Sequence, residues 1–312
     1  MAASGSKLVI MAALIGNGLI SITKFIAAGI TGSSAMLAEG IHSVVDTGNQ
    51  VLLLHGLRRS ALPPDRRYPF GHGREIYFWS FVVAILIFAV GSGITLYEGI
   101  SHLRDPRPIE KPIVNYIVLG LAIVFESFAW YFAFREVGRI KGKRGYLRAV
   151  KDGKDPSLFV VLFEDTAAML GLFVALGGLI LVQVTGMPIF DGISSILISV
   201  ILAVTAIWLA IETKSLLIGE AADPETVDAL REMVGATDGI DSVHEIFTMH
   251  NGPEDILVTI SVDFKDDLVA GQLEKTIGSL EDSIRSRYPA IKRIFIEGEA
   301  FCRPLPPPPG ES

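Results

Sequence analysis

The sequence has very little cysteine and a modest share of charged residues. Its one cysteine, Cys302, excludes an intrachain disulfide and a zinc knuckle built from cysteine ligands. Charged residues make up 20% of the 312 residues, below the roughly 25% of soluble domains, and the mean hydropathy is +0.47. An excess of basic residues is also lacking, and the net charge of −7 argues against a nucleic-acid-binding protein. This composition predicts a membrane protein.

The sequence also lacks a recognisable leader peptide. The first apolar run, from Leu8 to Ile30, is longer than a signal-peptide core, and no small-residue cleavage site follows it. No Arg- and Ser-rich transit peptide precedes it. We therefore expect this run to be a retained membrane helix in a bacterial-type inner (plasma) membrane rather than in an organelle.

Six apolar runs predict six transmembrane helices. Each is near or above the roughly 20 residues that a helix needs to cross about 30 Å of hydrocarbon. Basic residues concentrate in the links between the second and third and between the fourth and fifth runs, which the positive-inside rule places in the cytoplasm with both termini. The runs cover residues 8–30, 34–57, 77–102, 112–134, 157–183 and 188–212.

From about Lys214 the sequence has the patterning of a soluble domain. Asp223 and Pro224 are typical of a helix start, and NGPE supplies a turn between two strand-like segments. The predicted order is helix, strand, strand, helix, strand, which suits one small α+β domain. We expect a transmembrane domain over 1–213, a cytoplasmic domain over 214–302 and a disordered proline-rich tail over 303–312.

The second apolar run carries ionisable residues in the stretch EGIHSVVD. Such groups are costly at membrane depth, and each is a candidate functional residue. His42 and Asp46 are spaced i, i+4 and share one helix face, with Asn49 one turn further and Glu39 one turn back. Imidazole and carboxylate together suit Zn²⁺ and, less sharply, Co²⁺, Fe²⁺ or Mn²⁺. The alternative is a polar pair that holds two helices together.

The fifth run carries a second pair, Glu164 and Asp165, about 14 Å beyond the expected helix start at Asp155. Neighbouring helix residues point about 100° apart, so we expect one of them to face a metal and the other to handle a proton or a polar partner. The alternative is an interfacial carboxylate pair. Glu126 in the fourth run is a candidate proton carrier or a residue that supports a metal ligand.

Several motifs in this sequence resemble one transporter family. GSSAMLAEGIHSVVDTGNQ and YPFGHGREIYF are similar to the second span and following loop of the cation diffusion facilitator family. DPSLFVVLFEDTAAMLGL resembles the fifth span of its zinc transporter 9-like branch. The resemblance covers nearly the whole chain. It implies an all-α six-span transmembrane bundle followed by a C-terminal cytoplasmic α+β ferredoxin-like domain.

The resemblance also implies a homodimeric, alternating-access antiporter that exports a divalent cation, most simply Zn²⁺, in exchange for protons. The family's transport site takes two residues from each of spans two and five. His42 and Asp46 match the first pair and Asp165 matches one member of the second, whereas Val161 stands at the other position and cannot bind metal. Glu164, water or Asn49 would then complete the site. Mn²⁺, Fe²⁺ or Co²⁺ is the alternative cargo, and no prosthetic group is implied.

Other ligand positions of the family are only partly kept. Asp65 and His72 stand where some members bind metal in the loop after span two, but Tyr68 replaces a histidine. In the soluble domain His244 matches one ligand of a zinc pair, while the other positions hold Ile260, Glu297 and Glu299, so we expect a dimerisation module with little or no metal. His250 is expected to be a turn residue.

The resemblance further suggests an ion pair between Arg74 and Glu220, which would tie the membrane part to the soluble domain. The alternative is a solvated surface pair that contributes about 0–1 kcal/mol.

Two other classes of protein use similar residues. A membrane metalloenzyme would activate water at the same ligands, but the sequence shows no HExxH or similar signature, and we expect no enzyme. A membrane-anchored scaffold would keep its function when the metal ligands are removed. In the transporter interpretation, metal ligands must be deprotonated, so metal and protons compete for one site. An unperturbed imidazole changes charge near pH 6.5, within the physiological range.

Overall fold

The computed structural model describes residues 2–106, 112–140 and 154–299. The chain divides into two compact units, residues 1–217 and 218–312, whereas the sequence predicted a boundary at 213/214. Cys302, the proline-rich tail and most of the basic link before the fifth predicted span lie outside the described residues.

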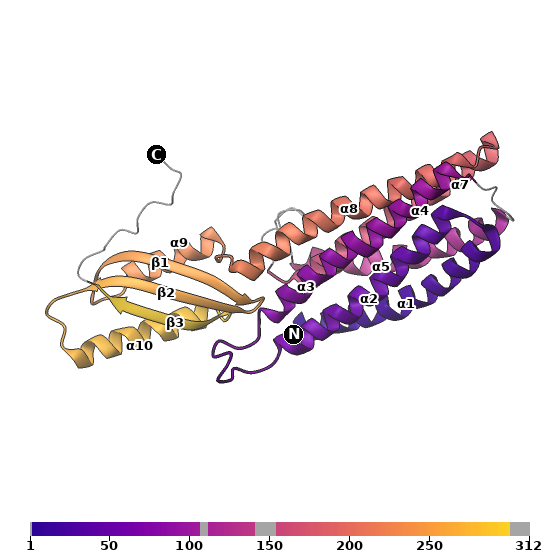
Figure 1. The fold of residues 1–312 in the computed structure, drawn as a ribbon. Helices are drawn as coiled ribbons and strands as arrows, with labels where there is room; N and C mark the ends of the chain where they lie inside the picture. Colours follow the sequence, from indigo (N-terminus) through magenta and orange to yellow (C-terminus); the bar gives the residue numbers. More distant parts are fainter. Residues whose placement is uncertain (1, 107–111, 141–153, 300–312) are drawn as a thin grey trace, which may run out of the picture. The chain divides into compact units, whose positions relative to one another are not determined.

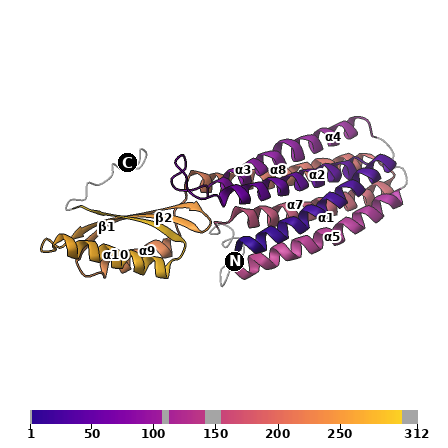
Figure 2. The ribbon, with the colours of Figure 1, turned by 90° about the horizontal axis from the view of Figure 1, so that it is seen from below.

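The first unit is a bundle of long helices that run alongside one another (Figure 1). The helix α2 packs against α1, α3, α4 and α7, so it lies at the centre of the bundle. Figure 2 shows the same arrangement from a perpendicular direction. The helices are α1 (Ala2–Thr31), α2 (Ser34–Ser60), α3 (Glu75–Leu86), α4 (Gly93–Arg104), α5 (Pro112–Ile140), α7 (Pro156–Thr185) and α8 (Ile189–Ile218).

The third predicted span is a helix that changes its winding. A π-helical segment, η1 (Ile87–Ser92), joins α3 to α4, and it packs against α2. The apolar run from 77 to 102 predicted one regular helix here. Single π-helical turns are often found at functional sites in helices.

Five helical segments of the described chain are long and apolar enough to cross a membrane, so the protein is a multi-pass membrane protein. The second predicted span, residues 34–57, corresponds to α2, which is 27 residues long but less apolar than the five segments. The reason is visible in its buried face, which carries Glu39, His42, Asp46, Asn49 and Gln50. The five segments are Leu14–Thr31, Glu75–Arg104, Pro112–Arg139, Pro156–Thr185 and Ile189–Ile218.

The helix ends follow capping chemistry. Asp155 precedes Pro156 and accepts a hydrogen bond from the Ser157 backbone N–H, which starts α7 where the sequence predicted it. The first turn of α2 is capped from another helix: the Asp191 carboxylate of α8 accepts hydrogen bonds from the Ser34 N–H at 2.6 Å and from the Ser33 hydroxyl at 2.7 Å. Asp191 therefore fixes the position of α2 against α8.

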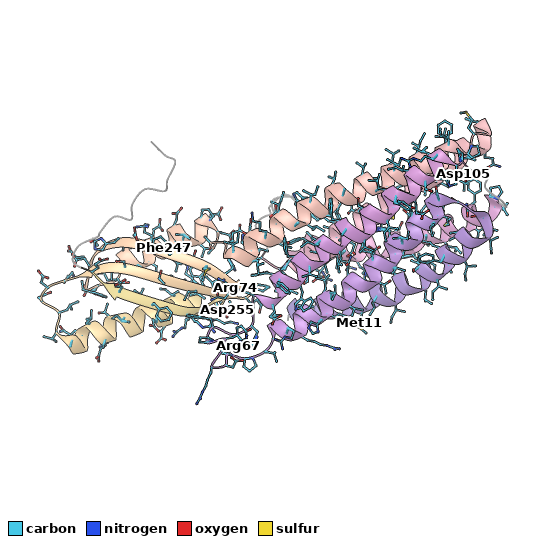
Figure 3. The ribbon with its side chains drawn as sticks, viewed as in Figure 1. Met11, Arg67, Arg74, Asp105, Phe247 and Asp255 are labelled. Atoms are coloured by element: carbon cyan, nitrogen blue, oxygen red, sulfur yellow. The ribbon has the colours of Figure 1, made fainter. Side chains whose placement is uncertain are left out.

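Arginine residues gather at one end of the bundle. Arg67 and Arg74 lie at one end, in the loop between α2 and α3, while Asp105 lies at the other end (Figure 3). Arg58 and Arg59 in the last turn of α2 belong to the same basic end.

The second unit is a three-stranded sheet with two helices. The order along the chain is α9 (Pro224–Gly235), β1 (Ile240–Gly252), β2 (Asp255–Phe264), α10 (Ala270–Arg287) and β3 (Ile291–Gly298). β2 is central, antiparallel to β1 and parallel to β3. This is the helix and strand order that the sequence predicted. The description of this domain as ferredoxin-like goes further than the three described strands show.

The core of the second unit is apolar. Val258 and Ile260 alternate along β2 with half-buried residues, as the period of a strand requires. Leu230 of α9 and Leu280 of α10 pack into the same cluster, so both helices cover one face of the sheet (Figure 2).

Candidate metal site

The helix α2 places His42 and Asp46 on its buried face. Both side chains are almost fully buried, and His42 Nδ1 lies 3.4 Å from Asp46 Oδ1. The i, i+4 spacing produces this proximity, because residues four apart lie one above the other on a helix. Asn49, one turn further along, is buried as well.

The helix α7 brings its carboxylates to the same buried region. Glu164 and Asp165 are both buried, and the Asn49 side chain donates a hydrogen bond of 2.6 Å to Glu164 Oε1. The carboxyl groups of Asp46 and Glu164 also interact electrostatically. The polar face of α2 therefore meets α7 at Glu164.

Asp165 lies on a different side of α7 from Glu164. Its charged neighbours are Glu126 of α5 and Glu164, and no hydrogen bond joins it to α2 among the described residues. The family resemblance favoured Asp165 as the metal ligand, with Glu164 as one way to complete the site. The contacts with α2 support Glu164 as a direct participant. Val161, which stands at the other ligand position of the family and whose side chain cannot bind metal, is buried in the apolar core.

This buried cluster keeps much of its hydrogen-bonding capacity unused. Within the part of the chain that the structure describes, one or both polar side-chain atoms lack a hydrogen-bond partner in His42, Asp46, Glu126, Glu164 and Asp165. Most buried polar groups in proteins are hydrogen-bonded, so each exception calls for an explanation such as an ion or water that binds there. The donor types, one imidazole and several carboxylate oxygens, suit a divalent cation.

The geometry does not yet form a complete site. Across residues 2–106, 112–140 and 154–299, no three His, Cys, Asp or Glu side chains are grouped closely enough to hold one metal ion. The set of His42, Asp46, Glu164 and Asp165 therefore stays a prediction about the metal-bound protein.

A lysine that was not predicted to be a site residue lies beside this cluster. Lys24 of α1 is completely buried, and its Nζ donates hydrogen bonds to Glu39 Oε2 at 3.0 Å and to Ser43 Oγ at 2.8 Å. The signal was present, since SITKFIAAG places a lone lysine inside an apolar run. The rule that singles out acidic residues at membrane depth applies equally to bases.

The loop between α2 and α3 holds a second, smaller polar group. Asp65 Oδ2 lies 3.2 Å from His72 Nε2, and Asp65 Oδ1 accepts hydrogen bonds from the backbone N–H groups of Tyr68 and Arg67. The hydrogen bond from the Tyr68 backbone, followed by that with His72, lowers the pKa of Asp65 below its ordinary value. Asp65 and His72 are thus paired with each other, and metal binding at this loop stays a prediction.

The remaining predicted positions lie in several places. His244 Nε2 lies 2.9 Å from the backbone oxygen of Glu299, and His250 is buried at the end of β1. Arg74 belongs to the first unit and Glu220 to the second, so their ion pair stays a prediction.

Comparison with known proteins identifies the family. Residues 10–218 match the family model described as the cation efflux transmembrane domain, and residues 222–301 match that of the cation efflux protein cytoplasmic domain. The mouse proton-coupled zinc antiporter SLC30A9, mitochondrial, is 33% identical over 274 residues, which are 87% of this chain and 48% of the mouse protein. The chain thus spans about half the length of this relative.

Two further relatives come from a plant and a bacterium. Metal tolerance protein C4 of Arabidopsis thaliana is 30% identical, covering 88% of this chain and 61% of the plant protein. The cation-efflux pump FieF of Escherichia coli is 26% identical, covering 89% of this chain and 87% of the bacterial protein. The chain belongs to the cation efflux family, on the branch that resembles the SLC30A9 antiporters.

Proposed function

We propose that this protein exports a divalent metal cation, with Zn²⁺ as the expected cargo, in exchange for protons. The observation that carries the proposal is the meeting of α2 and α7 at buried polar side chains, where Asn49 donates to Glu164 beside His42 and Asp46. The relatives support it by their names: a proton-coupled zinc antiporter, a metal tolerance protein and a cation-efflux pump.

The proposed ligands are His42 and Asp46 from α2 with Glu164 and Asp165 from α7. Asn49 orients Glu164 through its hydrogen bond, while the buried Glu39 and Glu126 are proposed as further ligands or as residues that support the ligands. One imidazole among several oxygens is less selective for zinc than a nitrogen- and sulfur-rich site, so Mn²⁺, Fe²⁺ and Co²⁺ are the competing cargoes.

Coupling to protons follows from the chemistry of the ligands. Carboxylates must be ionised and imidazole neutral to bind a metal, so metal entry expels protons and proton entry releases the metal. If the cluster opens alternately to the two sides of the membrane, a proton gradient drives the metal outward. The protein then needs no separate coupling device.

The proposed topology has six spans, with α2 as the span inside the bundle. Its 27 residues extend about 40 Å, more than the roughly 30 Å of hydrocarbon, and its polar side chains point inward. The basic end of the bundle faces the cytoplasm together with both termini. We propose the cell (inner) membrane as the location, although the mouse relative is mitochondrial by name.

The second unit is proposed to be a cytoplasmic, ferredoxin-like dimerisation domain that joins two copies of the chain. Its match to the cation efflux cytoplasmic domain supports this role. The Arg74–Glu220 ion pair is proposed to connect the two units, and the Asp65–His72 pair is proposed as a weak loop site for metal.

The test is zinc movement into proteoliposomes that contain a metal-sensitive dye, driven by an imposed pH gradient. His42→Ala should lower the initial rate at least about 100-fold, because even residues that only orient metal ligands cost 10–100-fold when mutated. His55→Ala, at an exposed position of the same helix, is the matched control and should transport normally. Wild-type rates in His42→Ala would refute the site, and a wild type that moves none of Zn²⁺, Mn²⁺, Fe²⁺ and Co²⁺ would refute the function.

A further inference from the structure

Lys24 is a buried cation in the part of α1 that crosses the membrane. It lies ten residues after Leu14, where the candidate span begins, or about 15 Å along the helix. Its side chain has no exposure to solvent. A charge at this depth is retained only where it has partners and a use.

The partners of Lys24 come from α2. Glu39 and Ser43 are spaced i, i+4, and each receives a hydrogen bond from Nζ, so the ammonium group lies over one face of α2. The second oxygen of Glu39, Oε1, points at α7: a Cβ atom added to Gly171 would lie 2.5 Å from it. Gly171 therefore leaves the room that the carboxylate occupies between α2 and α7.

The charge of Lys24 also reaches the candidate metal site. It acts electrostatically on His42 and Asp46 of α2 and on Glu126 of α5, in addition to Glu39. The acidic residues of this region come from three helices and outnumber the one lysine. They are Glu39, Asp46, Glu126, Glu164 and Asp165.

The ammonium group of Lys24 neutralises a buried carboxylate and binds a hydroxyl oxygen, as a bound metal cation would. Oxygen donors of this kind also hold hard divalent cations. While Nζ holds Glu39 Oε2, this carboxylate is neutralised and is not free to bind the transported ion. The positive charge also repels a second divalent cation from this side of the cluster.

We propose that Lys24 is a specificity-determining residue that occupies the place of a second cation. Its ammonium group removes Glu39 from the set of metal ligands and limits the transport site to one divalent ion per chain. This inference rests on the proposed function, because it concerns the metal that the site carries. Without the lysine charge, the oxygens of Glu39, Ser43 and Glu126 become donors for a second ion.

The experiment counts metal ions bound to the purified full-length protein, using Zn²⁺ and Mn²⁺ in separate equilibrium-dialysis measurements. Every protein in this measurement carries Asp65→Asn as well, which removes the proposed loop site from the count, and the protein with Lys24 intact should bind one ion per chain. Lys24→Ala and Lys24→Gln should bind two, and glutamine keeps a hydrogen-bond donor for Glu39 without the charge. Lys24→Arg, which keeps the charge, should bind one. The double variant Lys24→Ala/Glu39→Gln, which removes both charges of the pair, should return to one.

One bound ion per chain in both Lys24→Ala and Lys24→Gln would overturn the proposal. A Lys24→Gln protein that does not fold would also overturn it, since the ion pair would then have a structural role only. Zinc uptake by the wild type is measured in parallel. If the wild type takes up zinc and the Lys24 variants still bind one ion per chain, this inference alone is refuted. If the wild type takes up no zinc, the proposed function is refuted.

Discussion

The two units of the chain bury different kinds of side chain. In the second unit the core is built from apolar residues, and among its described residues only His250 and Asn251 are buried polar side chains. The first unit buries one lysine, one imidazole of the candidate site and several carboxylates in addition to its apolar core. Burying such groups opposes folding, so their presence marks where function rather than stability selected the residues.

The first unit itself contains two kinds of buried acid. Asp191 is fully buried, and its oxygens accept hydrogen bonds from Ser33, Ser34 and Ala35. Glu126 is equally buried, but neither of its oxygens has a hydrogen-bond partner in the described chain. The hydrogen bonds of Asp191 account for its burial by a structural role. The oxygens of Glu126 lack such bonds, which indicates that an ion or a proton binds there during function.

The largest effect is expected from placing an acid in the apolar core of the second unit. Val258→Asp puts a carboxylate at the centre of β2, where no polar partner is available among the described core residues. We expect a loss of at least about 4 kcal/mol in the free energy of unfolding of this unit. Limited proteolysis of the full-length protein in detergent measures it, because cleavage can be mapped to residues 218–312.

The control for Val258→Asp is Thr259→Asp, the next residue along β2, which is half-buried on the opposite face. We expect a cost of about 1 kcal/mol from the lower strand preference of aspartate. Equal protection from protease in the two variants would mean that the second unit tolerates buried charge, and the contrast between the units would fail.

The second prediction removes an unsatisfied charge from the first unit. Asp165→Asn keeps the shape of the side chain but removes its charge, so transport should fall at least about 100-fold. Stability should stay equal or rise by about 1 kcal/mol, because a neutral amide is less costly to bury than a carboxylate. Proteoliposome uptake and thermal unfolding in detergent measure the two effects. A variant that loses both stability and transport would indicate a structural carboxylate instead.

Much of the architecture could be predicted from the sequence because it depends on local patterns. The apolar runs predicted the long helices, and Asp155 with Pro156 predicted the start of α7. The alternation from Ile256 to Val262 predicted β2. These features follow from helix and strand periods and from capping, which neighbouring residues alone determine.

The features that were missed depend on contacts between distant residues. Whether Glu164 or Asp165 faces α2 is set by the rotation of α7 in the bundle, which no local pattern encodes. The π-helical winding of Ile87–Ser92 leaves no signal in an apolar run. Asp191 was not singled out, because its partners lie about 157 residues away at the start of α2.

The third prediction removes the satisfied acid. Asp191→Ala deprives the first turn of α2 of its acceptors for the Ser34 N–H and for two hydroxyl groups. We expect a loss of about 2 kcal/mol in thermal unfolding, the upper range for a helix cap. Asp191→Asn keeps one acceptor oxygen and should lose about half as much. Zinc binding by the folded protein should persist in both variants, and its disappearance would assign Asp191 to the metal site.

The smallest effect is expected at the exposed Asp238–Lys265 ion pair of the second unit, whose nitrogen and oxygen lie 2.8 Å apart. The hydrogen bond from Lys265 lowers the pKa of Asp238 below its ordinary value of 3.8, and the same bond raises the pKa of Lys265 above 10.5. The contribution of Asp238 to the free energy of unfolding is present above about pH 3.8 and is lost as the pH falls through its lowered pKa. The contribution of Lys265 to the same free energy is present below about pH 10.5 and is lost as the pH rises through its raised pKa.

Between pH 5 and 9 the pair is therefore fully charged, and its effect on stability should not change with pH. Because both groups are exposed to solvent and screened by salt, Lys265→Met should lower the melting temperature by less than about 1 °C at 0.15 M salt. Thermal unfolding of the full-length protein at pH 5, 7 and 9 measures this. A larger shift, or one that varies across this range, would mean that a surface charge stabilises the second unit as strongly as its apolar core residues do.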